Sequence, residues 1–223
     1  MNRTRQTGSV QEPPEIASLF LAGARTVADA IADPSVARAW NLPSVLEEQP
    51  VSSLAGHLAR GGVWAVSEYL DAGVPPGPVD FESAGEYFAS VVSDLSADAN
   101  RAIRDRAAAV ASVGCEELLR TLRERVDALS VRVPGLKPDR LIAVIGGRVM
   151  RLEDYLTTRI VEQTVHLDDL ARSVDRRPWP MPAGAEALTI AVGLEIARRR
   201  SGQTAVIRAL YRRGLAGTTL PVL

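Results

Sequence analysis

The sequence RIVEQTVHLDDLA, from Arg159 to Ala171, is the segment from which the fold can be predicted. Its apolar positions recur at the three- and four-residue spacing of a helix that we expect to run from residue 152 to about residue 173. Successive helical residues are about 100° apart, which places Glu162 and His166 side by side, at the edge of the apolar stripe that contains Tyr155. We therefore expect these two polar side chains to point into the protein.

The rest of the chain also has helical periodicity and little strand signal. The helices that we predict cover residues 15–33, 52–73, 81–97, 100–129, 183–200 and 203–213, with Ser52 or Ser53 as the N-cap of the second. Residues 81–129 would form one long kinked helix or two consecutive ones. Residues 34–50 are expected to form a structured loop, and residues 129–138 a short extended segment.

These elements predict an all-α protein in which four long helices surround one core. We divide the chain into a disordered N-terminal tail over residues 1–14, a four-helix bundle over residues 15–175 and a short helical C-terminal extension over residues 176–223. The number of subunits is not indicated, and a homodimer is compatible with the sequence.

Composition excludes several classes of partner. The chain has 26 basic and 27 acidic residues, and its net charge of -1 gives no reason to expect binding to nucleic acid or to an anionic membrane. Basic residues in stretches such as RAIRDRA alternate with acidic ones, as on a solvated helix face. The sequence has no signal peptide and no run of roughly 18 apolar residues, so we expect a cytoplasmic protein. The single cysteine, Cys115, cannot form an intramolecular disulfide and is expected to be a packing residue.

The chain has only two histidines, and both are predicted to face the interior. His57 lies on the apolar face of the second helix, between Leu54, Leu58, Gly61 and Trp64. A buried carboxylate such as Glu162 needs compensation, which a divalent cation would provide. Two imidazoles and one carboxylate are a common ligand set for Zn²⁺, and Ni²⁺ or Fe²⁺ also suit these donors. Asp169 is placed to accept a hydrogen bond from an imidazole behind the ligands.

Two less specific interpretations remain open at this point. Glu162 and His166 are also spaced as a salt-linked pair on neighbouring helical turns, and His57 as an ordinary core histidine. Arg60 and Arg159 lie near the expected mouth of the site, where they would orient anionic groups of a substrate by bidentate contacts. The alternative for these arginines is a surface or structural ion pair.

Two motifs carry a resemblance to a known family. LEEQPVSSLAGHLARG at residues 46–61 and RLEDYLTTRIVEQTVHLDDLARS at residues 151–173 resemble the mycothiol-dependent maleylpyruvate isomerase N-terminal family, within the DinB/YfiT-like superfamily of metalloenzymes. The resemblance covers roughly residues 15–175. It implies an up-down-down-up four-helix bundle and a divalent metal held by His57, Glu162 and His166.

The resemblance also implies a function. A metal would activate the small thiol mycothiol for attack on a small electrophilic substrate, in a transferase or cis–trans isomerase reaction. The maleylpyruvate isomerase carries a larger C-terminal α+β domain that contributes to substrate binding, whereas residues 176–223 alone follow the bundle here. We therefore do not expect maleylpyruvate to be the substrate. A metal-dependent hydrolase and a non-catalytic metal-binding or regulatory bundle remain alternatives.

Overall fold

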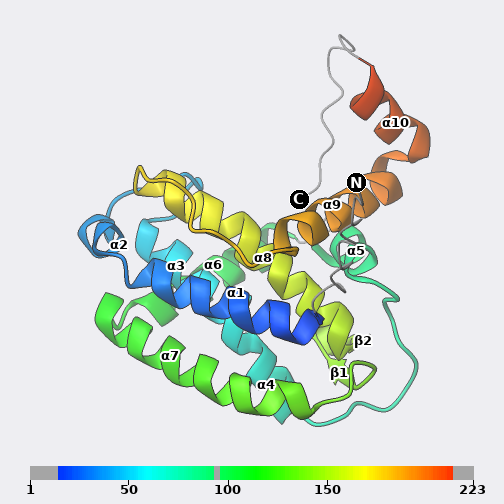
Figure 1. Ribbon diagram of the computed structural model, residues 1–223, viewed down its shortest axis with the longest axis horizontal. Helices are drawn as coiled ribbons and strands as arrows, with labels where there is room; N and C mark the ends of the chain where they lie inside the picture. Colours follow the sequence, from blue (N-terminus) through cyan, green and yellow to red (C-terminus); the bar gives the residue numbers. More distant parts are fainter. Residues whose placement is uncertain (1–14, 93–95, 213–223) are drawn as a thin grey trace, which may run out of the picture.

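The computed structural model describes residues 15–92 and 96–212, which are mostly helical (Figure 1). The tail predicted over residues 1–14 lies outside this part of the chain. The α-helices are α1 (Ile16–Ile31), α2 (Pro34–Ala39), α3 (Val51–Ala59), α4 (Ala65–Asp71), α5 (Ala84–Tyr87), α6 (Ala97–Ala111), α7 (Cys115–Arg132), α8 (Leu152–Ser173), α9 (Ala185–Ser201) and α10 (Gln203–Tyr211). Two short strands, β1 (Leu141–Ala143) and β2 (Val149–Arg151), form an antiparallel hairpin.

The longest helix, α8, organises the core. It begins and ends where the periodicity predicts, with Glu153 and Asp154 in its first turn and Arg172 in its last, as the helix dipole favours. One side of α8 packs against α1, and another packs against α3 (Figure 1). α1 also contacts α7, and α3 also contacts α6. Side chains from these helices, such as Phe20, Leu54, Leu122 and Ile160, are buried in one apolar cluster.

The second predicted helix is present but interrupted. α3 and α4 are joined by a π-helical turn, Arg60–Trp64, so that the helical path runs from residue 51 to residue 71 with one widened turn. The helix starts after Pro50, and Ser53 is buried inside it, so the prediction of Ser52 or Ser53 as N-cap was wrong. Gly73, with φ of 87°, follows the end of α4, as expected of a glycine that stops a helix.

Residues 81–138 differ most from the prediction. α5 is a single turn that continues into a π-helical turn, Phe88–Val92, and Gly114, with φ of 91°, separates α6 from α7. The expectation of an extended segment over residues 129–138 was wrong for its first part, because α7 continues to Arg132 and a 3-10 turn follows it. Leu129 and Val133 are buried there, and this packing outweighs the strand preference of the valines.

One smaller difference concerns a loop, and one expectation about a side chain agrees with the structure. The loop predicted over residues 34–50 contains α2, which starts at Pro34 and is capped by Asp33, whose carboxylate accepts a hydrogen bond of 2.9 Å from the Ser35 amide. Cys115 is half-buried against the core at the start of α7, which agrees with a packing residue, and burial raises the pKa of its thiol.

The C-terminal extension is helical over its described part. α9 packs against α8 and α5, whereas α10 packs on α9 and extends away from the helical body (Figure 1). Ser83, at the start of α5, donates a hydrogen bond of 2.7 Å to Glu195 on α9. No helix within residues 15–92 and 96–212 is long and apolar enough to cross a membrane.

Candidate metal site

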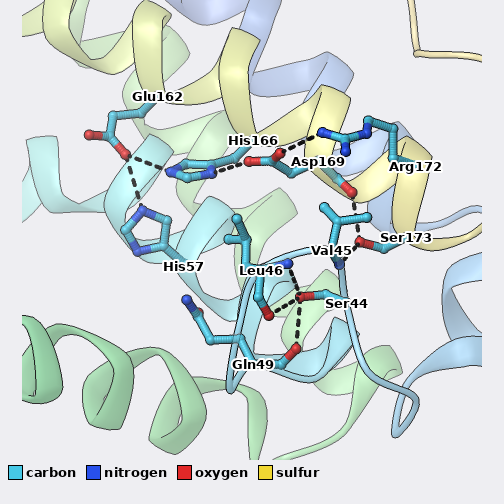
Figure 2. Close-up of polar contacts among 10 residues, drawn as sticks. All are labelled: Ser44, Val45, Leu46, Gln49, His57, Glu162, His166, Asp169, Arg172 and Ser173. Carbon is cyan, nitrogen blue, oxygen red and sulfur yellow. Dashed lines mark hydrogen bonds and ion pairs between the residues drawn. The ribbon is translucent and has the colours of Figure 1, made fainter. Parts of the chain in front are cut away.

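His57, Glu162 and His166 converge in the structure. Glu162 Oε2 lies 3.1 Å from His57 Nε2 and 3.4 Å from His166 Nε2, so one carboxylate oxygen faces both imidazoles (Figure 2). One donor atom from each of the three residues lies within 4.8 Å of the other two. The two imidazole rings meet edge to face, with centroids 4.8 Å apart. These residues come from α3 and α8, and 105 positions of sequence separate His57 from Glu162.

The three side chains are half-buried, as the helical spacing predicts. Their exposed fractions are 23% for His57, 16% for Glu162 and 20% for His166. Gly61 allows the His57 ring to lie close to the following helical turn, because a Cβ at this glycine would be 3.2 Å from His57 Cε1. Each of the three side chains is therefore packed against neighbouring residues and remains partly accessible to solvent.

The local charges couple Glu162 to both histidines. Burial alone would raise the pKa of Glu162, but hydrogen bonds with His166 and His57 and the charge of Arg159 hold that pKa well below its ordinary value. Burial alone would lower the pKa of His166, whereas its hydrogen bonds with Asp169 and Glu162 raise that pKa to about 9. The protein therefore maintains an ionised carboxylate between two imidazoles.

Asp169 lies where the sequence places it, behind His166. Its Oδ2 is 3.0 Å from His166 Nδ1, which leaves His166 Nε2 to face Glu162 (Figure 2). The backbone carbonyl of Asp169 accepts a hydrogen bond of 2.7 Å from Ser173, whose hydroxyl in turn accepts one of 3.0 Å from the Val45 amide. These contacts fix the orientation of the His166 ring and connect the end of α8 to the loop before α3.

The donor set fits a divalent cation. Two imidazole nitrogens and one carboxylate oxygen are borderline to hard donors, of the kind that holds Zn²⁺, Ni²⁺ or Fe²⁺. All three residues line the same cavity, so a divalent cation held by them would be accessible from it. The same distances also fit a salt-linked cluster in which Glu162 pairs with protonated imidazoles. The geometry is therefore compatible with both interpretations, a metal site and an ion-paired cluster.

The cavity beside the cluster has a volume of about 320 Å³. Its wall includes His57, Glu162 and His166, together with aromatic, aliphatic and cationic side chains from α4, α5, α6 and α8. A space of this size accommodates a small organic molecule. Among the described residues none after α8 lines it, and α9 reaches the cavity only through its contact with α5.

Both arginines that the sequence suggested line this cavity, in different ways. Arg159 is only 7% exposed, and it donates hydrogen bonds to the Gly61 carbonyl at 2.7 Å and to Thr158 Oγ1 at 3.0 Å. Its guanidinium carbon lies 4.7 Å from the centroid of the Tyr155 ring. Arg60 is more exposed and forms an ion pair of 2.7 Å with Glu68. Arg159 is therefore part of the wall, whereas Arg60 lies nearer to solvent.

Sequence reasoning missed other residues of the cavity wall. Tyr69, Tyr87 and Tyr155 line it, as does Arg106, which the charge pattern had assigned to a solvated face. Tyr155 could have been found, since it precedes Glu162 by seven residues on the same side of α8. Tyr87 and Arg106 gave no such signal, because the direction of their side chains depends on the bounds of α5 and α6, which differ from those predicted.

Comparison with known proteins identifies one family. The model of the mycothiol maleylpyruvate isomerase N-terminal domain matches residues 20–171, which include most of α1, all of α2 to α7, most of α8 and the three converging residues. No curated protein and no solved structure was found to match the chain. The match spans most of the sequence, and the chain therefore belongs to the mycothiol maleylpyruvate isomerase N-terminal domain family.

Proposed function

We propose that the protein is a divalent-metal-dependent enzyme that uses mycothiol to attack a small electrophilic substrate, as a transferase or isomerase. The observation that carries this proposal is the convergence of His57, Glu162 and His166 on the wall of a cavity of about 320 Å³, in a chain that belongs to a mycothiol-related family. Zn²⁺ is the proposed ion, with Ni²⁺ and Fe²⁺ as alternatives. Residues 15–175 would form the DinB-like, up-down-down-up four-helix bundle and residues 176–223 a separate extension.

The chemistry requires a thiolate next to an electrophile. A bound divalent cation lowers the pKa of a coordinated thiol, so that the sulfur is deprotonated at neutral pH. The chain itself supplies the orientation: Asp169 fixes the ring of His166, and Glu162 faces both imidazoles through one oxygen. Arg60 and Arg159 are proposed to attract anionic groups of the substrate, since both line the cavity.

The partners of the site are therefore proposed to be small molecules. The cavity is lined by side chains of one chain, and the near-neutral net charge of -1 offers no surface field for nucleic acid. Arg106 and Arg60, at the more exposed part of the wall, would be the first groups that an anionic substrate meets.

Metal content and thiol consumption test the proposal together. Purified protein, wild type and His57→Ala and Glu162→Gln variants, would be analysed for bound metal and then assayed for loss of mycothiol with 1-chloro-2,4-dinitrobenzene. Glu117→Gln is the matched control, because this exposed carboxylate on α7 pairs with Arg120 and lies outside the cavity wall. We expect the first two variants to lose both metal and thiol consumption, and the control to retain both.

Two results would contradict the proposal. If the wild-type protein binds no divalent metal, the cluster is an ion-paired network and the non-catalytic alternative applies. If the metal-loaded protein neither binds nor consumes mycothiol, the thiol chemistry is wrong, and hydrolysis becomes the leading alternative.

A further inference from the structure

Three tyrosines from three separate helices meet at the cavity. Tyr69 on α4, Tyr87 on α5 and Tyr155 on α8 all line it. The rings of Tyr69 and Tyr155 are packed edge to face, with centroids 5.3 Å apart. Tyr155 is 2% exposed and Tyr87 is 7% exposed, so two of these phenols are almost completely buried beside the candidate metal site.

The hydroxyl groups of Tyr87 and Tyr155 make no hydrogen bond within the described part of the chain. Buried tyrosine hydroxyls normally find a partner, because an unpaired buried polar group is costly. Neither of these two oxygens is among the fully buried unpaired atoms of the described chain, so both remain accessible from the cavity. Thr158 on α8 follows that rule by donating to the Tyr155 carbonyl at 2.6 Å. Gln163 follows it only in part: its amide nitrogen donates to Gly62 at 2.9 Å, whereas its Oε1 is buried without a partner in the described chain. The two phenols instead belong to side chains that line the cavity, which makes its contents their available partner.

Both phenols are donors at neutral pH. Burial raises the pKa of Tyr87 and of Tyr155 above the ordinary value, and the negative charge of Glu162 acts in the same direction. Arg159 lies against the Tyr155 ring and opposes this rise without outweighing it. The cavity thus presents neutral hydroxyl donors beside a fixed positive charge, an arrangement that suits an oxygen atom carrying negative charge.

We propose that Tyr155 and Tyr87 donate hydrogen bonds to the oxygen of the electrophile on which negative charge develops during thiolate attack. This inference rests on the proposed function and assigns catalytic residues to it. In the step, the sulfur–carbon bond forms at the β-carbon of an activated double bond, and the π electron pair moves through the carbonyl group to its oxygen. The phenol protons stay on the tyrosines. Expulsion of the thiolate after bond rotation gives an isomer, and protonation of the α-carbon by water gives the conjugate.

The first test needs neither metal nor thiol. 4-Nitrophenol, an analogue of a developing oxyanion, is titrated in metal-free protein, and the pKa of the bound dye is followed by the absorbance of its phenolate. We expect the wild-type protein to lower that pKa, and Tyr155→Phe to return it toward the value of the free dye. Tyr211→Phe is the control, because this tyrosine on α10 is 73% exposed and lies outside the cavity wall. Failure of the dye to bind, or equal pKa values in wild type and Tyr155→Phe, would overturn the inference.

The second test uses the metal-loaded protein and two electrophiles. Tyr155→Phe and Tyr87→Phe should lower kcat for mycothiol with N-ethylmaleimide by about tenfold or more, since an oxyanion forms in this reaction. The rate with benzyl bromide should stay within about twofold, because its negative charge leaves on bromide and no oxyanion donor is required. An equal loss with both electrophiles would mean that the phenols have a structural role.

A stability measurement further separates a catalytic role of Tyr155 from a structural one. Tyr155→Phe removes no hydrogen bond within the described chain, so the melting temperature should be unchanged or slightly higher. A clear decrease would contradict the inference. If the wild-type protein fails to consume mycothiol, the proposed function fails, and the dye titration still decides the role of the tyrosines.

Discussion

Removing the charge of Asp169 should make the stability of the metal-free protein less dependent on pH. In the wild type, Asp169 and Glu162 raise the pKa of His166 from 6.5 to about 9. Because the folded-state pKa lies above the unfolded value, the stabilisation is fully present below about pH 6.5 and is lost as the pH rises through about 9. The Asp169→Asn variant keeps an oxygen that can accept from His166 Nδ1 but removes the negative charge.

The magnitude follows from the pKa rise and from the geometry. A rise from 6.5 to about 9 corresponds to about 3 kcal/mol, shared between the two carboxylates that contact His166. Asp169 is the closer partner, at 3.0 Å against 3.4 Å, and it is 14% exposed, so solvent screens the pair only partly. We expect Asp169→Asn to reduce the free energy of unfolding by about 1–2 kcal/mol near pH 6 and by under about 1 kcal/mol near pH 10.

Urea unfolding of chelator-treated protein, followed by far-UV circular dichroism, measures both values. Asp168→Asn is the matched control, because Asp168 is the adjacent residue of α8 and is exposed to solvent. This control should follow the wild-type dependence on pH. Equal destabilisation by Asp169→Asn at both pH values would refute the reasoning, because it would mean that the carboxylate acts through packing or through neutral hydrogen bonds alone.

Three further predictions concern the site and the packing around it. Glu162→Gln should weaken Zn²⁺ binding by at least about tenfold, measured by competition with a chelating dye, because a neutral amide replaces the charged ligand; unchanged affinity would exclude this residue as a ligand. Gly23→Ala should lower the free energy of unfolding by about 1–3 kcal/mol in urea, since its Cβ would lie 2.2 Å from Oε1 of the fully buried Gln163; wild-type stability would show that the carboxamide can move away. Glu195→Ala should accelerate amide hydrogen exchange in α5 by removing the acceptor of the Ser83 hydroxyl; wild-type exchange there would mean that α9 does not hold α5 in place.

The sequence predicts those parts of the fold that depend on a local pattern. α1 and α8 are long and periodic, and they appear close to their predicted bounds, as does the long helix α9. The breaks in residues 81–138 carry local signals that the prediction did not use, namely the N-caps Ser83 and Ser96 and Gly114, whose φ is positive, whereas the end of α7 depends on packing. Val131 and Val133 favour a strand by composition, yet α7 includes the first, and the second is buried against the core.

The candidate site likewise contains residues that a local pattern reveals and residues that depend on packing between helices. Glu162, His166 and Asp169 could be grouped from the sequence because they share one helix, where spacing determines direction. His57 could be assigned to the same site only through the resemblance to the family, because its position alone also fits an ordinary core histidine. Tyr87 could not, since its place in the cavity depends on how α5 packs against α8 and α9. Contacts between helices, rather than residue types, determine which remote side chains join a site.

The π-helical turn after α3 illustrates such a contact and gives Arg159 a structural function. Arg159 and Gln163, four residues apart on α8, donate to two consecutive carbonyls of this turn, Gly61 at 2.7 Å and Gly62 at 2.9 Å. Glu162 lies between Arg159 and Gln163 along α8, and His57 lies one helical turn before Gly61. The two hydrogen bonds therefore fix the position of Glu162 relative to His57. The widened turn offers its carbonyls to a neighbouring helix, as π-helical turns at functional sites often do. A guanidinium already held by this carbonyl, by Thr158 and by the Tyr155 ring has less freedom to follow a substrate than Arg60 has. The alignment of the proposed ligands thus depends on two side chains that are not themselves ligands.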